Sequence, residues 1–358
     1  MVYYISKGRQ NVHHAGGKAP NDIDTLCERR GWQELLYPDP ALTKTEHQVL
    51  FRVRRGLLVL LFWCTVLFKV HPDDVIFYQH PVRYGSKIAS FFLRKLRRRN
   101  VKFIVLIHDL DSLRYQLLWS EQARTNVHFE DGEFLKQFDA VICHNEYMKE
   151  YLISTGVASD KLICLELFDY LLDEDGFTEL MEEDSLVVAG NLSTKKCGYI
   201  YELPQIGGEY HFNLYGLNYD DSIDRGRKLV YKGSFSPEEL PSVLSGKYGI
   251  VWDGNSIESC EGPAGNYLCF NNPHKFSLYM AAGIPVVTWS KAAIAPFINK
   301  YKLGVTVNSL RELSGKLQQV SEAEYEQMRG HVAEIRQQVI SGHYFNQAIE
   351  RALRLVEE

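Results

Sequence analysis

The chain is built from short apolar runs that alternate with longer segments of helical periodicity. In the first half the runs cover residues 74–79, 101–107, 140–143 and 161–165, and in the second half residues 185–189, 211–215, 229–232, 248–252 and 285–289. Continuous apolar runs of this length are typical of parallel strands that are covered by helices on both faces. The pattern therefore predicts an α/β fold with two doubly wound domains.

The length and one acidic stretch predict where the domains divide. A chain of 358 residues can bury two separate cores, each in a domain of roughly 150 to 180 residues. The stretch DEDGFTELMEED ends at Asp184 and has no apolar periodicity strong enough to belong to either core. We expect an N-terminal Rossmann-like domain at 1–170, a linker at 171–184 and a C-terminal Rossmann-like domain at 185–340. A final helix at 341–358 is expected to pack back on the N-terminal domain.

Composition excludes several classes of protein. The formal net charge of −5 argues against a dedicated nucleic-acid binder, whose surface is normally basic. The seven cysteines are scattered and contain no C-x-x-C pair, which is typical of a reducing cytoplasm and gives no zinc site. The opening MVYYISKGRQ predicts a first strand and lacks the apolar core of a secretory signal. We expect a cytoplasmic protein with no bound metal.

Two helical segments bear on membranes. Residues 57–68 are almost entirely apolar, but a membrane span needs about 20 such residues, so we expect a buried helix. Residues 85–100 predict an amphipathic helix with basic side chains opposite its apolar ones. Two interpretations stay open for it: a core-facing helix whose cations complement its own C-terminal dipole, and a helix that also contacts anionic lipid.

Residues 271–287, NNPHKFSLYMAAGIPVV, predict a helix whose N-terminus can receive a phosphate. Asn271 or Asn272 can cap it and Pro273 suits its first position, while Gly283 and Pro285 stop it before the next strand. Free backbone N–H groups and the positive end of the dipole favour an anion there. The residues expected to reach a diphosphate are His274, Lys275 and Ser277. An ordinary helix-to-strand unit is the alternative.

Residues that follow strands supply the other candidates, because ligands of open α/β sheets bind at the carboxyl ends of strands. In the second half, polar or aromatic residues follow three strands, and we expect them to surround one nucleotide-sugar site. They are Gly190, Asn191 and Lys195 after the first strand, Tyr215 as a platform for a base, and Asp253.

In the first half, a glycine pair and an aspartate are the candidates. Gly16 and Gly17 follow the first strand and can bring backbone amides close to a phosphate, although they do not form G-x-G-x-x-G. Asp109 follows the run FIVLI and can take a proton from a sugar hydroxyl. The alternatives are that Asp109 caps the next helix, that Asp111 is the base, or that the two bind a metal.

Four stretches carry a resemblance to a known family: residues 107–114, 189–197, 213–220 and 252–298. They resemble bacterial β-1,6-galactofuranosyltransferases of O-antigen polysaccharide synthesis and, more distantly, the glucosyltransferases that extend O-glycans on streptococcal serine-rich repeat adhesins. The resemblance implies a GT-B architecture with two Rossmann-like domains facing a cleft. It also implies UDP-sugar chemistry with inversion and no required cofactor or metal, and it supports donor binding by Gly190, Asn191, Lys195, Tyr215, Asn272, His274, Lys275 and Ser277.

The expected reaction is a single displacement at the anomeric carbon of a UDP-hexose. The donor is best assigned as UDP-galactofuranose and the acceptor as a lipid-linked or other growing cell-surface glycan, with Asp109 as the base. Such acceptors lead us to expect peripheral attachment at the inner face of the cell membrane through Arg94, Arg97, Arg98 and Arg99. A UDP-glucose-dependent enzyme and a non-catalytic UDP-binding partner protein are the alternatives, and self-association stays open.

Overall fold

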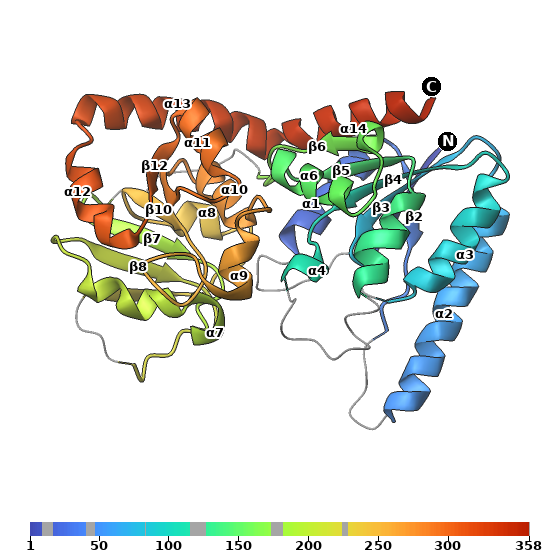
Figure 1. Ribbon diagram of the computed structural model, residues 1–358, viewed down its shortest axis with the longest axis horizontal. Helices are drawn as coiled ribbons and strands as arrows, with labels where there is room; N and C mark the ends of the chain where they lie inside the picture. Colours follow the sequence, from blue (N-terminus) through green and yellow to red (C-terminus); the bar gives the residue numbers. More distant parts are fainter. Residues whose placement is uncertain are drawn as a thin grey trace.

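The chain folds into two lobes, each built around a parallel six-stranded sheet, as the alternating pattern predicts (Figure 1). The computed structural model describes residues 1–8, 17–40, 47–82, 84–114, 127–172, 182–223 and 228–357. Gly16 and most of the expected linker lie outside these residues. All nine predicted apolar runs are strands in the structure.

The N-terminal sheet has the strand order β2-β1-β3-β4-β5-β6. Its strands are β1 (Val2–Ser6), β2 (Gln33–Leu36), β3 (Val75–His80), β4 (Lys102–Ile107), β5 (Ala140–Cys143) and β6 (Leu162–Cys164). The α-helices of this lobe are α1 (Lys18–Arg29), α2 (Gln48–Lys69), α3 (Ser86–Arg97), α4 (Asp111–Arg114) and α6 (Glu146–Ser154). All strand pairs are parallel, so every strand ends at the same edge of the sheet.

The C-terminal sheet has the order β12-β11-β10-β7-β8-β9 and is also parallel throughout. Its strands are β7 (Ser185–Ala189), β8 (His211–Tyr215), β9 (Leu229–Gly233), β10 (Tyr248–Val251), β11 (Val286–Trp289) and β12 (Gly304–Val307). Its α-helices are α7 (Thr194–Cys197), α8 (Leu240–Val243), α9 (Gly262–Tyr267), α10 (His274–Ala281), α11 (Ala295–Tyr301), α12 (Leu313–Gln318) and α13 (Glu322–Ser341).

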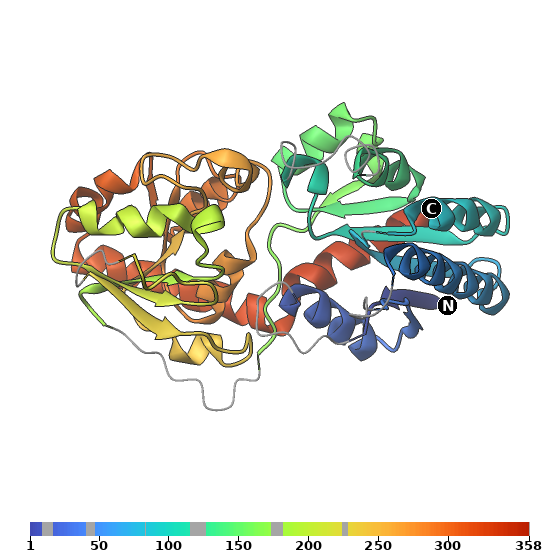
Figure 2. The same ribbon diagram turned by 90° about the horizontal axis from the view of Figure 1, so that it is seen from below.

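The C-terminal helix α14 (His343–Glu357) crosses from the C-terminal lobe to the N-terminal one (Figures 1 and 2). It packs on β4, β5, β6 and α1. The turn before it depends on Gly342, whose φ is 86° and where a Cβ would lie 2.4 Å from Leu26 Cδ2. Asp169 accepts hydrogen bonds from the backbone N–H groups of Tyr344 (3.1 Å) and Phe345 (2.7 Å). The chain between the two sheets is thereby fixed to the start of α14.

The structure corrects the expectation that residues 57–68 form a buried helix. They belong to the 22-residue helix α2, whose buried side chains are Val59, Trp63 and Val66. Leu57, Leu61 and Phe68 are 56%, 63% and 85% exposed. The reason is that α2 packs on the lobe and on α3 with one face, whereas the sequence is apolar on both faces. Among the described helices, none has the length and apolarity needed to cross a membrane.

The basic residues of α3 also differ from the expectation. Arg97 forms an ion pair with Asp139, and Arg99 donates hydrogen bonds to the carbonyls of Leu67 and Val70 at 2.6 Å each. These two cations therefore hold the lobe together, whereas Arg94 and Arg98 are exposed.

Candidate active site

The predicted phosphate-binding helix α10 begins one residue later than expected. Pro273 occupies the N-cap position, and the first helical residue is His274. Asn272 does not cap it but joins the two lobes. Its backbone N–H donates to His144 Nδ1 (3.0 Å), and its side-chain N–H groups donate to the carbonyls of His144 (3.1 Å) and Glu166. These bonds engage its amide in the contact between the lobes, and its assignment to the donor stays a prediction.

Lys275 lies in the first turn of α10, where its charge is already paired. Its Nζ donates to Asp253 Oδ1 (2.8 Å) and to the carbonyl of Trp252 (2.7 Å), and both charged side chains are about nine-tenths buried. Burial alone would raise the pKa of the Asp253 carboxyl, but Lys275 and Lys196 outweigh it and lower this pKa. The Asp253 carboxylate therefore holds the ammonium group of Lys275 in place at the start of α10.

Two other predicted donor residues point into the protein. Ser277 is 2% exposed, and its hydroxyl donates to the carbonyl of Phe168 at 2.7 Å. Tyr215 is also 2% exposed, and its hydroxyl accepts a hydrogen bond from the backbone N–H of Ser245 at 3.1 Å. The Tyr215 ring is buried because strand β8 is covered on both faces, and its stacking on a base stays a prediction that this conformation does not display. Ser277 likewise belongs to the contact between the lobes.

The remaining candidates of the C-terminal lobe lie nearer its surface. Gly190 follows β7 with φ of 133°, and its N–H donates to the carbonyl of Tyr215 at 2.9 Å. Asn191 Oδ1 accepts from the Ser193 N–H at 3.1 Å, and Lys195 is exposed on α7. The Oδ1 of Asn271 is buried and has no hydrogen-bond partner among the described residues. Their assignment to the donor stays a prediction.

The first residues of α1 and α10, one from each lobe, contact the same tyrosine. Lys18 Nζ lies 5.1 Å from the ring centroid of Tyr170, and the ring of His274 stacks on it at 5.1 Å. Gly17 is the N-cap of α1, and because it has no side chain it leaves the first N–H groups of the helix without a side-chain cap. Neither ring nitrogen of His274 has a hydrogen-bond partner among the described residues. Two positive helix ends, which favour an anion, and an imidazole thus lie around one ring, although Lys18 already pairs with Asp22 at 2.7 Å.

Asp109 lies at the carboxyl end of β4 and faces the other lobe. Its carboxylate pairs with Arg114, and its side chain is 28% exposed. The next backbone N–H, that of Leu110, donates to the hydroxyl of Tyr267 on α9 at 2.9 Å. Asp111 is 5% exposed at the start of α4. Of the two aspartates, Asp109 is the more accessible to an acceptor hydroxyl.

Three histidines that the sequence analysis did not single out lie at the ends of adjacent strands. His80 ends β3, His108 follows β4 and His144 follows β5. His80 Nε2 lies 2.8 Å from Asp131 Oδ1, and His108 Nε2 lies 2.7 Å from Gln79 Oε1. The sequence could have pointed to them by their position, because each histidine stands at the end of an apolar run and such run ends lie at one edge of a parallel sheet.

Burial keeps several of these groups uncharged near neutral pH. His108, His144 and His274 surround Phe168 with ring centroids 5.4, 4.9 and 6.2 Å away. Desolvation lowers the pKa of His108 to about 3 and those of His144 and His274 to about 4. For His274 the backbone of Asp169 acts in the opposite direction and is outweighed.

A buried carboxyl completes this network. Asp24 accepts hydrogen bonds from Ser6 Oγ (2.5 Å) and from Gln79 Nε2 (2.7 Å), and Gln79 connects it to His108. Burial raises the pKa of Asp24 to about 7, although both hydrogen bonds act to lower it. The carboxyl edge of the N-terminal sheet therefore holds neutral imidazoles and a carboxyl that is partly protonated near pH 7.

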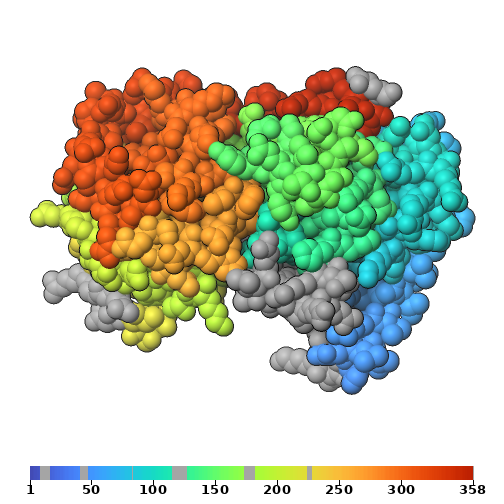
Figure 3. Space-filling view, viewed as in Figure 1, coloured from blue at the N-terminus to red at the C-terminus, as the bar shows by residue number. Residues whose placement is uncertain are grey.

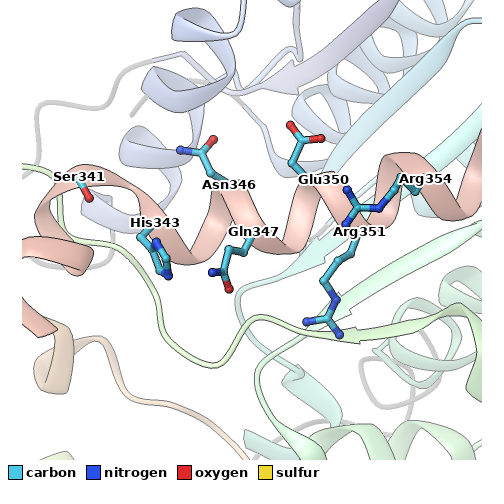
Figure 4. Close-up of a pocket in the computed structure, with 7 residues that line it drawn as sticks. All are labelled: Ser341, His343, Asn346, Gln347, Glu350, Arg351 and Arg354. Carbon is cyan, nitrogen blue, oxygen red and sulfur yellow. The ribbon is translucent and has the colours of Figure 1, made fainter.

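A hollow of about 510 Å³ lies along α14, away from these residues (Figure 4). It is lined by Ser341, His343, Asn346, Gln347, Glu350, Arg351 and Arg354. Arg30 of α1 donates to Asn346 Oδ1 at 2.8 Å and pairs with Glu350, so part of this wall braces α14 against α1. None of the seven residues belongs to the predicted donor site.

Within the described chain, no three His, Cys, Asp or Glu side chains are grouped to hold a metal ion.

Comparisons with known proteins agree with this architecture. The model of the glucosyltransferase 3-like N-terminal domain matches residues 2–167, and that of the C-terminal domain matches residues 186–352. The chain is 34% identical over 297 residues to the β-1,6-galactofuranosyltransferase WbbI of Escherichia coli K12, covering 81% of this chain and 82% of the relative. It is 26% identical to glucosyltransferase 3 of Streptococcus gordonii, covering 87% and 85%.

Solved structures show the same fold at lower identity. Sucrose-phosphate synthase from Thermosynechococcus elongatus superposes with a TM-score of 0.61 at 16% identity, covering 99% of this chain and 98% of that one. The lipopolysaccharide outer core galactosyltransferase WaaB gives 0.58 at 14% identity, covering 98% and 99%. With both family models matched along almost the whole length, the chain belongs to the glucosyltransferase 3-like family and is a glycosyltransferase of the GT-B fold.

Proposed function

We propose that the protein transfers a hexose, with galactofuranose as the best candidate, from a UDP-sugar to a hydroxyl of a growing, lipid-linked cell-surface glycan, with inversion. The observation that carries the donor assignment is the 34% identity to a β-1,6-galactofuranosyltransferase across 81% of the chain. The specific stretches at 107–114, 189–197, 213–220 and 252–298 support it further. No cofactor beyond the sugar nucleotide is required in this proposal.

The donor would bind where α1 and α10 begin. As UDP leaves, its new negative charge would be stabilised by the first turn of α10, by Lys275 and by the glycine loop that ends at Gly17. Lys275 would share its ammonium between Asp253 and the diphosphate. Such preorganised donors stabilise the transition state without having to reorient during the reaction.

The acceptor would approach from the N-terminal lobe. Asp109 would take the proton of the attacking hydroxyl while the hydroxyl oxygen bonds to the anomeric carbon and the bond to the UDP oxygen breaks. The ion pair with Arg114 supports this role, because it fixes the orientation of the carboxylate. The contacts of Asn272 and Tyr267 across the lobes would hold base and donor in register and exclude water.

A UDP-glucose donor is the second candidate. It is favoured by the description of the matching family models and by the glucosyltransferase 3 of S. gordonii. The two donors differ in ring size, so one screen separates them. The screen offers UDP-galactofuranose, UDP-galactopyranose and UDP-glucose with a lipid-linked glycan acceptor and follows release of UDP and the glycosylated product.

We expect turnover with UDP-galactofuranose and an inverted anomeric centre in the product. Turnover with UDP-glucose alone would move the assignment to the second candidate. UDP binding without turnover of any donor would instead favour the non-catalytic partner protein. Retention of the anomeric configuration would contradict the single displacement.

A further inference from the structure

The exposed face of α2 carries a row of large apolar side chains, which we call the α2 stripe. Its members are Leu50 (64% exposed), Val53 (54%), Leu57 (56%), Leu60 (42%), Leu61 (63%) and Phe68 (85%). The steps between them, of three, four, three, one and seven residues, keep all six on one side of the helix. The opposite side of α2 packs on the lobe through Val59, Trp63 and Val66. The stripe is thus unburied surface on a helix that is apolar on two faces.

The extent of the stripe separates it from ordinary surface leucines. From Leu50 to Phe68 the helix rises about 27 Å at 1.5 Å per residue, with five members between Leu50 and Leu61 and Phe68 about two turns further on. Single exposed apolar residues are common on soluble proteins, but contiguous apolar rows mark surfaces that bind something. In Figure 3 the blue atoms of α2 form the lower right-hand end of the molecule, open to solvent.

The charge of this region identifies the occupant. Residues 48–108, which include α2 and α3, contain twelve Lys and Arg against two Asp and Glu, a formal charge of +10, and the rest of the chain therefore carries −15. Exposed cations flank the stripe on α2 and on α3, which packs beside it. They are Lys69, Lys87, Arg94, Lys95 and Arg98. A second copy of this chain that docked through the same face would bring two strongly basic surfaces together, whereas an anionic bilayer is complementary to them.

We propose that the α2 stripe lies on an anionic lipid bilayer, with α2 parallel to the surface. The leucines and Phe68 would enter the boundary between headgroups and acyl chains, while the exposed cations of α3 contact lipid phosphates. This is the arrangement by which amphipathic helices bind membranes without crossing them. The inference goes beyond the proposed transfer reaction, and it moves the membrane contact expected from the sequence from the arginines near the end of α3 mainly to α2. It can be tested without any donor or acceptor.

The test is co-sedimentation of the full-length protein with vesicles of phosphatidylcholine alone or mixed with phosphatidylglycerol, at low and high salt. We expect binding to the mixed vesicles, weakened by high salt because exposed charges are screened. The double variant Leu57→Gln/Leu61→Gln should bind about tenfold less or weaker still, since the apolar contribution is lost. The variant Arg94→Gln/Arg98→Gln should lose about fivefold for each charge removed.

Matched controls keep the result interpretable. Ile153→Gln/Leu217→Gln removes two side chains that are 41% and 38% exposed elsewhere on the molecule, and it should bind like the wild type. Each variant is compared by thermal unfolding, so that loss of the fold is recognised. Absence of binding to mixed vesicles at low salt would overturn the proposal, as would undiminished binding of Leu57→Gln/Leu61→Gln.

A second copy as occupant gives a distinct result. Analytical ultracentrifugation would then show a dimer that Leu57→Gln/Leu61→Gln converts to monomer, with no vesicle binding by the wild type, and this too would overturn the proposal. Turnover of a UDP-sugar with a detergent-solubilised acceptor is measured separately on the same variants. This assay distinguishes failure of the membrane proposal from failure of the proposed transfer reaction.

Discussion

The carboxyl edges of the two sheets bring different chemistry to the region between the lobes. The C-terminal edge carries charge: Lys275 and Asp253 form a buried ion pair at 2.8 Å beside the start of α10. The N-terminal edge carries the more exposed ion pair of Asp109 and Arg114 beside neutral groups, with His108 and His144 held uncharged by burial and Asp24 holding a proton up to about pH 7. This difference fits the proposal above, in which the C-terminal lobe stabilises the charge of the leaving UDP and the N-terminal lobe takes the proton of the acceptor.

The largest expected effect tests the proton-handling side of this comparison. Asp109→Asn should lower turnover by about 100-fold or more and leave UDP affinity unchanged, because general-base catalysis contributes at least that much. Steady-state kinetics and calorimetry with UDP measure the two quantities. Asp111→Asn is the matched variant. If it loses turnover while Asp109→Asn does not, the base is Asp111.

The next effect tests the charge-handling side. Lys275→Ala should weaken UDP binding by about 1.5 to 3 kcal/mol, the range for hydrogen bonds to a charged group. The same change leaves Asp253 buried without its partner, so stability falls as well. Lys275→Met/Asp253→Asn removes both charges and should recover stability but not UDP affinity. Unchanged UDP affinity by calorimetry in the stable double variant would place the diphosphate elsewhere.

A third effect tests whether burial keeps the imidazoles neutral. The pKa of His274 is about 4 in the folded protein and about 6.5 when unfolded, so its contribution to stability is complete above pH 6.5 and is lost as the pH falls towards 4. Between pH 7.5 and pH 5 this loss amounts to about 2 kcal/mol. His274→Gln should therefore lose less stability than the wild type over that interval, as measured by urea unfolding.

The comparison with His274→Gln is needed because other groups act in the opposite direction. Burial raises the pKa of Asp22 to about 6 and those of Asp24 and Asp169 to about 7. Each of these carboxyls favours the folded state more as the pH falls from about 7 towards 4. These carboxyls are present in both the wild type and His274→Gln. The difference between the two proteins in the slope of unfolding free energy against pH therefore reports His274 alone. Equal slopes would mean that His274 is solvated in solution.

Local patterns predicted the strands well because a parallel strand that is buried on both faces has apolar residues at nearly every position. Runs such as 101–107 and 185–189 became β4 and β7 with nearly the predicted bounds. The two strands without a prediction, β2 and β12, lie at sheet edges. In β2 only Leu35 is buried, so its sequence carries little of the apolar signal.

Side-chain roles were harder to predict because they depend on the other lobe. Asn272 could cap α10 from its sequence position, but His144 and Glu166 supply partners 128 and 106 residues away. The helix α2 was expected to be buried because its composition does not show which face meets the lobe. The three histidines at strand ends gained significance only when the strand order placed β3, β4 and β5 side by side.

The smallest expected effect tests whether Ser277 belongs to the lobe contact or to the diphosphate site. Ser277→Ala removes one hydrogen bond and leaves the carbonyl of Phe168 without this donor, which should cost about 1 kcal/mol of stability. UDP affinity should stay unchanged if the hydroxyl serves only the contact between lobes. Thr288→Ala is the matched control, because that buried hydroxyl donates to the carbonyl of Val251 at 3.2 Å within a single lobe. A loss of UDP affinity in Ser277→Ala that Thr288→Ala does not share would return Ser277 to the donor site. The site that stabilises the diphosphate would then extend two residues along α10 beyond Lys275, up to the contact with the N-terminal lobe.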